Sequence, residues 1–227
     1  MKETKAIRQG DKRMQNMMKA AIFDMDGTLI DSMEQWRSLN ASFLREQGVS
    51  LSRDQEEDLR SMTGRMVVDH AKENFGVETS FDLLVSRALK AMEPLYLAGM
   101  PLKPGAREYL QRLGARGVKR VLFTATHARL ALIALNRMEL TRELDYIICT
   151  DMLGGSKSDP AMFDRVCGII GEKNGDCVMF EDAVYAMRGA RAAGLGVIGI
   201  TDETNVRDRE DIRAVCDRVI DSYDEME

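Results

Sequence analysis

The second half of the chain alternates short apolar runs with amphipathic segments, and this alternation limits the folds open to it. Each amphipathic segment repeats its apolar residues at helical spacing. Because consecutive parallel strands need a crossover connection, usually a helix, the pattern predicts a parallel sheet covered by helices on both faces. The expected strands are 118–123, 146–149, 177–180 and 197–200, and the expected helices are 127–138, 161–170 and 183–193.

The first hundred residues add one strand and a helical insertion. An apolar run at 20–23 predicts a further buried parallel strand. Between 33 and 100 the apolar residues recur at helical spacing instead. We therefore expect an α/β core with a doubly wound parallel sheet, built from residues 19–32 and 101–227 and interrupted by an all-helical domain at 33–100. Residues 1–18 are polar without periodicity, and we interpret them as a flexible extension.

Composition excludes several classes of protein. Hydrophobic residues make up 44% of the 227-residue chain and charged residues 30%, which is ordinary for a globular protein. The net charge of −5 argues against nucleic acid or an anionic membrane as the main partner. No membrane-spanning stretch or signal peptide is recognisable. The cysteines lack metal-binding spacing, and we interpret them as reduced thiols of a cytoplasmic protein that is a monomer or a weak dimer.

Acidic residues follow the first and the fourth predicted strands. They are Asp24 and Asp26 in one place, and Glu181 and Asp182 in the other. Ligands of parallel α/β sheets bind beyond the carboxyl ends of the strands, and Mg2+ prefers carboxylate oxygens and relieves their mutual repulsion. From the residues alone, a solvated turn explains the first pair as well, and the charge preference of a helix N-terminus explains the second.

Two further segments could bind phosphate. Thr124 ends the second strand, and its hydroxyl and the free backbone N–H groups around Ala125 could hold phosphate oxygens, although Thr124 could equally cap the next helix. Lys157 could neutralise phosphoryl oxygens and an attacking carboxylate, or could be a surface lysine. Its segment, 154–158, is not a P-loop, because Ser156 stands where a glycine is required.

Taken in order, these motifs resemble the haloacid dehalogenase superfamily. The helical insertion after the first motif is similar to the cap of the phosphoglycolate phosphatase and β-phosphoglucomutase branch. The resemblance implies a Mg2+-dependent phosphatase of a small phosphorylated metabolite, such as a sugar phosphate or a phosphoglycolate-like compound. A sugar phosphomutase of the same branch and a non-catalytic binding protein are the alternatives. The motifs are Asp24 to Ser32, Phe123-Thr124, Lys157, and Phe180 to Ala183.

The resemblance also implies a role for each motif residue. Asp24 attacks phosphorus and becomes an aspartyl phosphate, and Asp26 protonates the leaving oxygen and then deprotonates the hydrolytic water. Thr124 hydrogen-bonds the phosphoryl group, and Lys157 holds it together with Asp24. The implied metal ligands are the Asp24 carboxylate, the Asp26 carbonyl, Asp182 and, directly or through a neighbour, Glu181.

Two positions separate the alternatives within the superfamily. Dehalogenase members lack the second acid of the first motif, so Asp26 favours phosphoryl transfer. Sugar phosphomutases of this branch carry a histidine where Trp36 falls, which makes the mutase the weaker hypothesis.

Substrate recognition is expected from the helical insertion and from the loop after the second strand. Arg65 lies in a connecting loop placed like the specificity loop of related enzymes, and it either contacts an anionic part of the substrate or is solvated. Trp36 either lines the entrance or packs inside a helical core. His127, beyond Thr124 and Ala125, is a further candidate substrate contact.

Overall fold

The structure is a computed structural model that describes residues 18–59, 62, 64–201 and 203–226. The interpretation of residues 1–18 as a flexible extension therefore lies outside the described residues, except at Met18, which is buried. The chain divides into two compact units. The first holds the described residues up to Asp31 together with those from Pro101 onward, and the second is Ser32–Met100.

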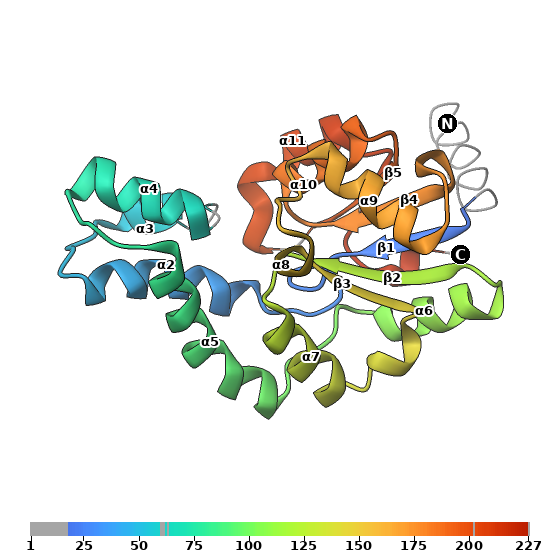
Figure 1. Cartoon of the computed structure of the whole chain (residues 1–227), viewed down its shortest axis with the longest axis horizontal. Helices are drawn as coiled ribbons and strands as arrows, with labels where there is room; N and C mark the ends of the chain where they lie inside the picture. The colour runs from blue at the N-terminus through green and yellow to red at the C-terminus, as the bar shows by residue number, and fades with distance from the viewer. Residues whose placement is uncertain (1–17, 60–61, 63, 202, 227) are drawn as a thin grey trace. The chain divides into compact units, whose positions relative to one another are not determined.

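A six-stranded sheet forms the centre of the first unit, in the order β3-β2-β1-β4-β5-β6 (Figure 1). All the recorded strand pairings are parallel, which confirms the predicted doubly wound α/β class. The chain moves from β1 outward to one edge and then to the other, so the strand order reverses at β1. Ligands of such sheets bind at this point, beyond the carboxyl ends of the strands. The strands are β1 (Ala20–Phe23), β2 (Lys119–Thr124), β3 (Tyr146–Cys149), β4 (Cys177–Glu181), β5 (Gly196–Ile200) and β6 (Arg218–Ile220).

Helices cover both faces of this sheet. Figure 1 shows α6 and α7 on one face and α9, α10 and α11 on the other. Short 3-10 helices join several of the elements. The α-helices of this unit are α6 (Ala106–Ala115), α7 (Ala128–Arg137), α8 (Thr150–Leu153), α9 (Pro160–Ile170), α10 (Val184–Ala192) and α11 (Arg209–Val215), and the 3-10 helices are η1 (Thr141–Glu143), η2 (Asn174–Asp176), η3 (Glu203–Asp208) and η4 (Tyr223–Glu225).

The central strands are apolar on both sides, because alternate residues of a strand point to opposite faces. Ile22 of β1 joins an apolar cluster with Phe163 of α9. The next residue, Phe23, points the other way: its ring stacks on Phe180 of β4 at 4.6 Å and meets Tyr109 of α6 at 6.3 Å. The unbroken apolar run of β1 is therefore explained by burial against both helical layers.

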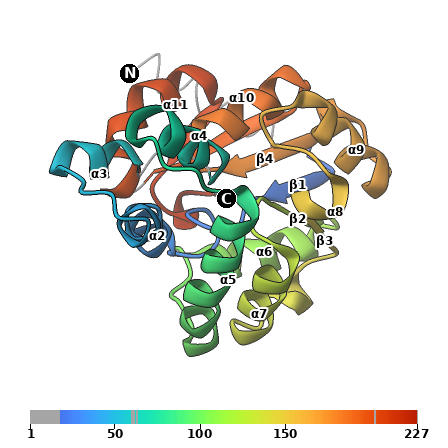
Figure 2. The ribbon, with the colours of Figure 1, turned by 60° about the vertical axis from the view of Figure 1, so that its left-hand side comes forward.

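The second unit is helical throughout its described residues, as Figure 2 shows from another side. Phe43 and Leu84 belong to its own apolar core. The buried side-chain amide of Asn40 donates to the carbonyl oxygens of Leu59 at 3.0 Å and Met62 at 3.1 Å, which fastens the first helix of the unit to the end of the second. The helices are α2 (Met33–Glu46), α3 (Arg53–Leu59), α4 (Gly64–Phe75) and α5 (Phe81–Ala98). In the described part of the chain, no helix combines the length and the apolar character needed to cross a membrane.

Candidate active site

A tight turn at the end of β1 presents two acids. Gly27 has a φ of 80°, in the left-handed region that glycine adopts without strain, and its N–H donates to the Ile30 carbonyl oxygen at 2.8 Å. The Ile30 N–H in turn donates to the Met25 carbonyl oxygen at 2.9 Å. The turn leaves Asp24 and Asp26 at the carboxyl end of β1, both of them buried. They therefore do not form a solvated turn.

Lys157 bridges the acids of two neighbouring strands. It lies between α8 and α9, and its side chain is 1% exposed. The ammonium Nζ donates to Oδ1 of Asp24 and, at 2.8 Å, to Oε2 of Glu181. Burial lowers the pKa of Lys157, but the Asp24 and Glu181 carboxylates outweigh it and raise this pKa above its usual value. Lys157 is therefore a buried, protonated lysine at the end of the sheet and not a surface lysine.

Gly189 of α10 allows this helix to approach the segment that carries Lys157. A Cβ atom on Gly189 would overlap the main-chain carbonyl oxygen of Lys157 and lie 3.0 Å from Cε2 of Phe163. We expect Gly189→Ala to lower the free energy of unfolding by about 1–3 kcal/mol, because a packed backbone must shift to admit the methyl group. Denaturant unfolding followed by circular dichroism measures the effect.

Gly168→Ala in α9 is the matched control for this substitution. Nothing lies within 4 Å of the Cβ position of Gly168, and its φ is not positive. Alanine there is expected to stabilise the protein by about 0.4–1 kcal/mol, since it loses less backbone entropy on folding than glycine. Equal effects of the two substitutions would show that the close approach at Gly189 is unimportant.

The two acids after β4 have different surroundings. Oε1 of Glu181 accepts the backbone N–H groups of Asp182 at 3.2 Å and Ala183 at 3.1 Å, while its Oε2 accepts from Lys157. Three donors thus hold the Glu181 carboxylate. The Asp182 carboxylate receives only a long hydrogen bond, 3.5 Å, from the hydroxyl of Thr28 among the recorded bonds.

Negative charge exceeds positive charge at this end of the sheet. One carboxylate oxygen each of Asp24, Glu181 and Asp182 lie within 4.8 Å of one another. Burial and the Glu181 carboxylate raise the pKa of Asp24 to about 7, even though Lys157 opposes them. Burial and the same Glu181 carboxylate raise the pKa of Asp182 well above its usual value. A cluster of buried oxygen donors with surplus negative charge suits a hard divalent cation such as Mg2+.

A threonine pair connects β2 to the second acid. Oγ1 of Thr124 accepts the backbone N–H of Thr126 at 3.1 Å, and Oγ1 of Thr126 donates to Oδ2 of Asp26 at 2.5 Å. Thr124 does not cap the following helix, because the N-cap of α7 is His127. Sequence reasoning did not single out Thr126. The signal that could have found it is a second hydroxyl two residues beyond Thr124, in the same strand-end turn.

His127 and Ala125 are exposed at the same turn. Nδ1 of His127 accepts the backbone N–H of Arg129 at 3.3 Å, and its Nε2 lies 3.6 Å from Oδ2 of Asp151. Asp151 also accepts the backbone N–H of Ala128 at 3.1 Å. The His127 ring therefore has a structural role at the start of α7, and its contact with a substrate stays a prediction.

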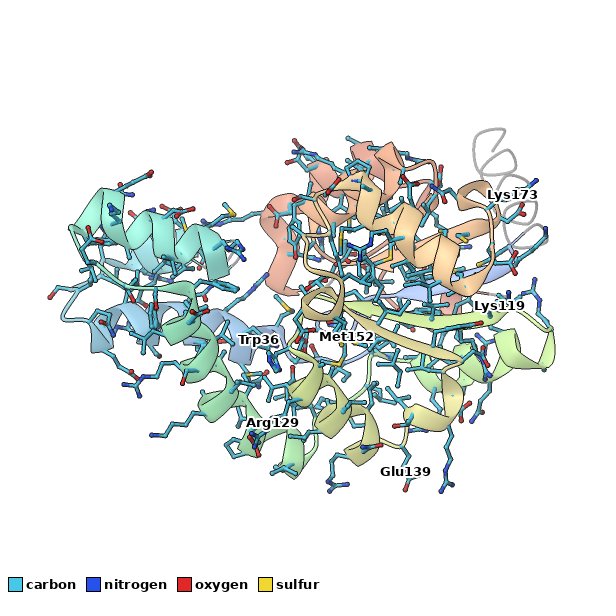
Figure 3. The ribbon with its side chains drawn as sticks, viewed as in Figure 1. Trp36, Lys119, Arg129, Glu139, Met152 and Lys173 are labelled. Atoms are coloured by element: carbon cyan, nitrogen blue, oxygen red, sulfur yellow. The ribbon has the colours of Figure 1, made fainter. Side chains whose placement is uncertain are left out.

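The two candidates in the helical unit have partners within that unit. Nε1 of Trp36, labelled in Figure 3, donates to the hydroxyl of Tyr96 at 3.0 Å and so connects α2 to α5. The exposed guanidinium of Arg65 lies 4.4 Å above the ring centroid of Phe81. Helix packing thus accounts for part of both side chains, and their contact with a substrate stays a prediction.

The structure brings the predicted core residues together in one unit. Asp24, Lys157, Glu181 and Asp182 form one charged cluster, and Thr126 joins Asp26 to the Thr124 turn beside it. Residues 18–194 match the family model of the haloacid dehalogenase-like hydrolases. The chain belongs to this family. The resemblance seen in the sequence is thereby confirmed.

Relatives of this haloacid dehalogenase-like hydrolase include named phosphatases. It is 30% identical over 189 residues to validoxylamine A 7'-phosphate phosphatase of Streptomyces hygroscopicus subsp. limoneus, covering 82% of this chain and 86% of the relative. It is 25% identical over 193 residues to the phosphorylated carbohydrates phosphatase of Thermotoga maritima, covering 83% and 88%. A crystal structure of a haloacid dehalogenase hydrolase of family IA, variant 3, from Entamoeba histolytica matches with a TM-score of 0.79 at 22% identity, over 92% of this chain and 96% of that one. This last likeness supports the fold.

Proposed function

We propose that this hydrolase is a phosphatase that cleaves a small phosphomonoester, with Asp24 as its nucleophile. One observation carries the proposal: the buried carboxylate of Asp24 is held by the buried ammonium of Lys157 at the point where the strand order reverses. A carboxylate fixed in this way is available for attack, and the ammonium beside it is placed to bind phosphoryl oxygens. The phosphatase names of the two relatives support the same reaction class.

In this proposal the phosphoryl group is bound by positive and hydrogen-bonding groups at the strand ends. Lys157 is protonated and lies against Asp24, so it can neutralise phosphoryl oxygens as the nucleophile approaches. The hydroxyl of Thr124 already accepts an N–H of its own turn, and its proton remains to be donated to a phosphoryl oxygen. Phosphoryl transfer is accelerated mainly by such positioning and charge stabilisation.

The proposed reaction has two steps. In the first, a carboxylate oxygen of Asp24 forms a bond to phosphorus as the bond to the leaving oxygen breaks, and the leaving oxygen takes a proton from the Asp26 carboxyl. In the second, the Asp26 carboxylate takes a proton from water, whose oxygen attacks the aspartyl phosphate. Inorganic phosphate leaves, and the Asp24 carboxylate is regenerated.

A divalent cation fits the surplus negative charge of the site. The side chains of Asp24 and Asp182 and the main-chain carbonyl of Asp26 would hold it, with Mg2+ the ion of choice for oxygen donors. Glu181 already accepts from Lys157 and from two backbone N–H groups, so we assign it to holding Lys157 in place. When bound, the cation supplies positive charge that offsets the negative charge of the transferring phosphoryl group.

The substrate class is proposed from the names of the relatives. Both are phosphatases of phosphorylated carbohydrates or related compounds, which points to a sugar phosphate or polyol phosphate. The helical unit, with Arg65 and Trp36, and the His127 turn would supply the selectivity as a cap and its facing loop. Trp36 stands where sugar phosphomutases of this branch carry a histidine, so hydrolysis is preferred over isomerisation.

A substrate screen tests the proposal. Purified protein with Mg2+ is incubated with sugar phosphates, polyol phosphates and phosphoglycolate, and inorganic phosphate is measured. We expect release from at least one of these classes. A folded protein that releases phosphate from none of them would overturn the phosphatase proposal. Isomeric sugar phosphates formed without free phosphate would identify a mutase instead.

Removal of metal is expected to lower phosphate release by roughly 100-fold or more, because the buried carboxylates would then oppose the anionic substrate. Chelation with EDTA followed by addition of Mg2+ should abolish and restore the activity. Asp182→Asn should raise the Mg2+ concentration needed for half-maximal activity. Asp164→Asn, at a carboxylate that accepts from Asn174 outside the site, should leave this concentration unchanged. Full activity after chelation would refute the assigned cation.

A further inference from the structure

A buried hydroxyl contacts the acid that the proposed reaction uses for proton transfer. Oγ1 of Thr126 donates to Oδ2 of Asp26 at 2.5 Å, and each of these two residues is 8% exposed. A short hydrogen bond between a hydroxyl and a carboxylate is stronger than a neutral one, because the acceptor carries charge. The contact joins the turn after β2 to the turn after β1, which are neighbours in the sheet.

The turn that carries Thr126 is fixed at both ends. At its start, the backbone N–H of Thr126 donates to the hydroxyl of Thr124 at 3.1 Å. At its end, the carboxylate of Asp151 accepts the backbone N–H of Ala128, the first residue of α7, at 3.1 Å. The hydroxyl of Thr126 is thus held in place by its own backbone, so it can impose a direction on the carboxyl group that it contacts.

We propose that Thr126 is a positioning residue that fixes the orientation of the Asp26 carboxyl group. Its hydroxyl occupies Oδ2, and this assigns Oδ1 to carry the proton that reaches the leaving group. As the phosphorus–oxygen bond breaks, its electron pair goes to the leaving oxygen, which forms a bond to that proton, while the electron pair of the Oδ1–H bond stays on Asp26. This inference rests on the proposed phosphatase function and adds to it a residue for the first step.

The dependence on the leaving group separates this role from a packing role. An alkoxide, as from a polyol phosphate, is a poor leaving group and needs a proton as it departs. The p-nitrophenolate anion is stable and departs without one. Damage to the delivery of the proton should therefore slow the cleavage of alkyl phosphates much more than that of p-nitrophenyl phosphate. Loss of packing would slow both, because Asp24 and the phosphoryl group are the same in each.

The test compares kcat/KM for the best alkyl phosphate and for p-nitrophenyl phosphate, since this ratio covers the steps up to formation of the aspartyl phosphate. Thr126→Val, of nearly the same volume but without the hydroxyl, should lose roughly 10- to 100-fold on the alkyl phosphate. Its loss on p-nitrophenyl phosphate should stay within about threefold. Thr126→Ser, which restores the hydroxyl, should recover most of the alkyl activity.

Two further measurements keep the outcome clear. Thr126→Ala removes the hydroxyl without the methyl group that valine places where the hydroxyl was, so it should reproduce the pattern of Thr126→Val even if valine impairs folding. Equal losses on both substrates, no loss on either, or a failure of serine to rescue would overturn the role of Thr126. A wild-type enzyme that cleaves neither substrate nor any other phosphomonoester would instead overturn the phosphatase function itself.

Discussion

Replacement of Asp24 by asparagine is expected to lower kcat for phosphate release by roughly 1000-fold or more. An amide oxygen is a poor nucleophile towards phosphorus and cannot form the aspartyl phosphate. The amide has nearly the size of the carboxylate, and its oxygen can still accept from Lys157. The substitution also removes one negative charge from a cluster that holds a surplus of them. We therefore expect the variant to fold, so that its loss of turnover reports on chemistry.

The covalent intermediate gives this prediction a direct readout. Wild-type protein quenched during turnover should carry one phosphoryl group, and borohydride should reduce the aspartyl phosphate at position 24 to homoserine, as mass spectrometry of peptides would show. Asp24→Asn should show neither. Asp211→Asn is the matched control, since Asp211 makes only an exposed ion pair with Arg188 at 3.2 Å. Phosphate release by Asp24→Asn at the wild-type rate would rule out Asp24 as the nucleophile.

Much of the site could be predicted because its residues directly follow apolar strands. Strands buried on both faces appear in a sequence as unbroken apolar runs, and parallel strands end at the same edge of the sheet. Asp24, Thr124 and Asp182 are each placed by such a run, so their proximity follows from the order of the strands alone. The same pattern explains why the predicted strand 20–23 coincides with β1.

Residues in loops were less predictable, because no periodicity constrains a loop. Lys157 could have been exposed, and its burial depends on distant features: the absence of a side chain at Gly189 and the ring of Phe123, whose centroid lies 5.5 Å from Nζ. Thr126 depends on a hydrogen bond within its own turn. The bond between Trp36 and Tyr96 joins residues that are sixty positions apart. Such contacts are set by packing, which a linear pattern does not contain.

Two elements of the fold were missed for different reasons. The helix α6 has Tyr109, Leu110 and Leu113 buried at helical spacing, but it directly follows the turn residues Pro104 and Gly105, which had been read only as the return from the helical insertion. Strand β6, Arg218–Ile220, is three residues long, which is too short for any period to be seen. It is recognised only by its parallel pairing with β5.

Lys157→Met is expected to lower both stability and turnover. Removal of the ammonium leaves the carboxylates of Asp24 and Glu181 buried without their counter-ion, at a cost of about 3–5 kcal/mol in the free energy of unfolding. Turnover should fall by roughly 100-fold or more, because the charge that neutralises the phosphoryl oxygens is lost. Lys19→Met is the control: Lys19 pairs with Asp176 at 2.8 Å at an exposed site, so its loss should cost at most about 1 kcal/mol.

A second substitution separates the two effects of Lys157→Met. Glu181→Gln removes one of the carboxylates left unpaired, and its amide oxygen can still accept the N–H groups of Asp182 and Ala183, as Oε1 of Glu181 does. The double variant should therefore recover much of the lost stability, since uncompensated charge is what destabilises the single one. It should recover none of the turnover, because no cation replaces the ammonium beside Asp24. If the double variant unfolds as readily as Lys157→Met, lost packing and not unpaired charge explains the instability, and if it regains activity, Lys157 does not act on the phosphoryl group.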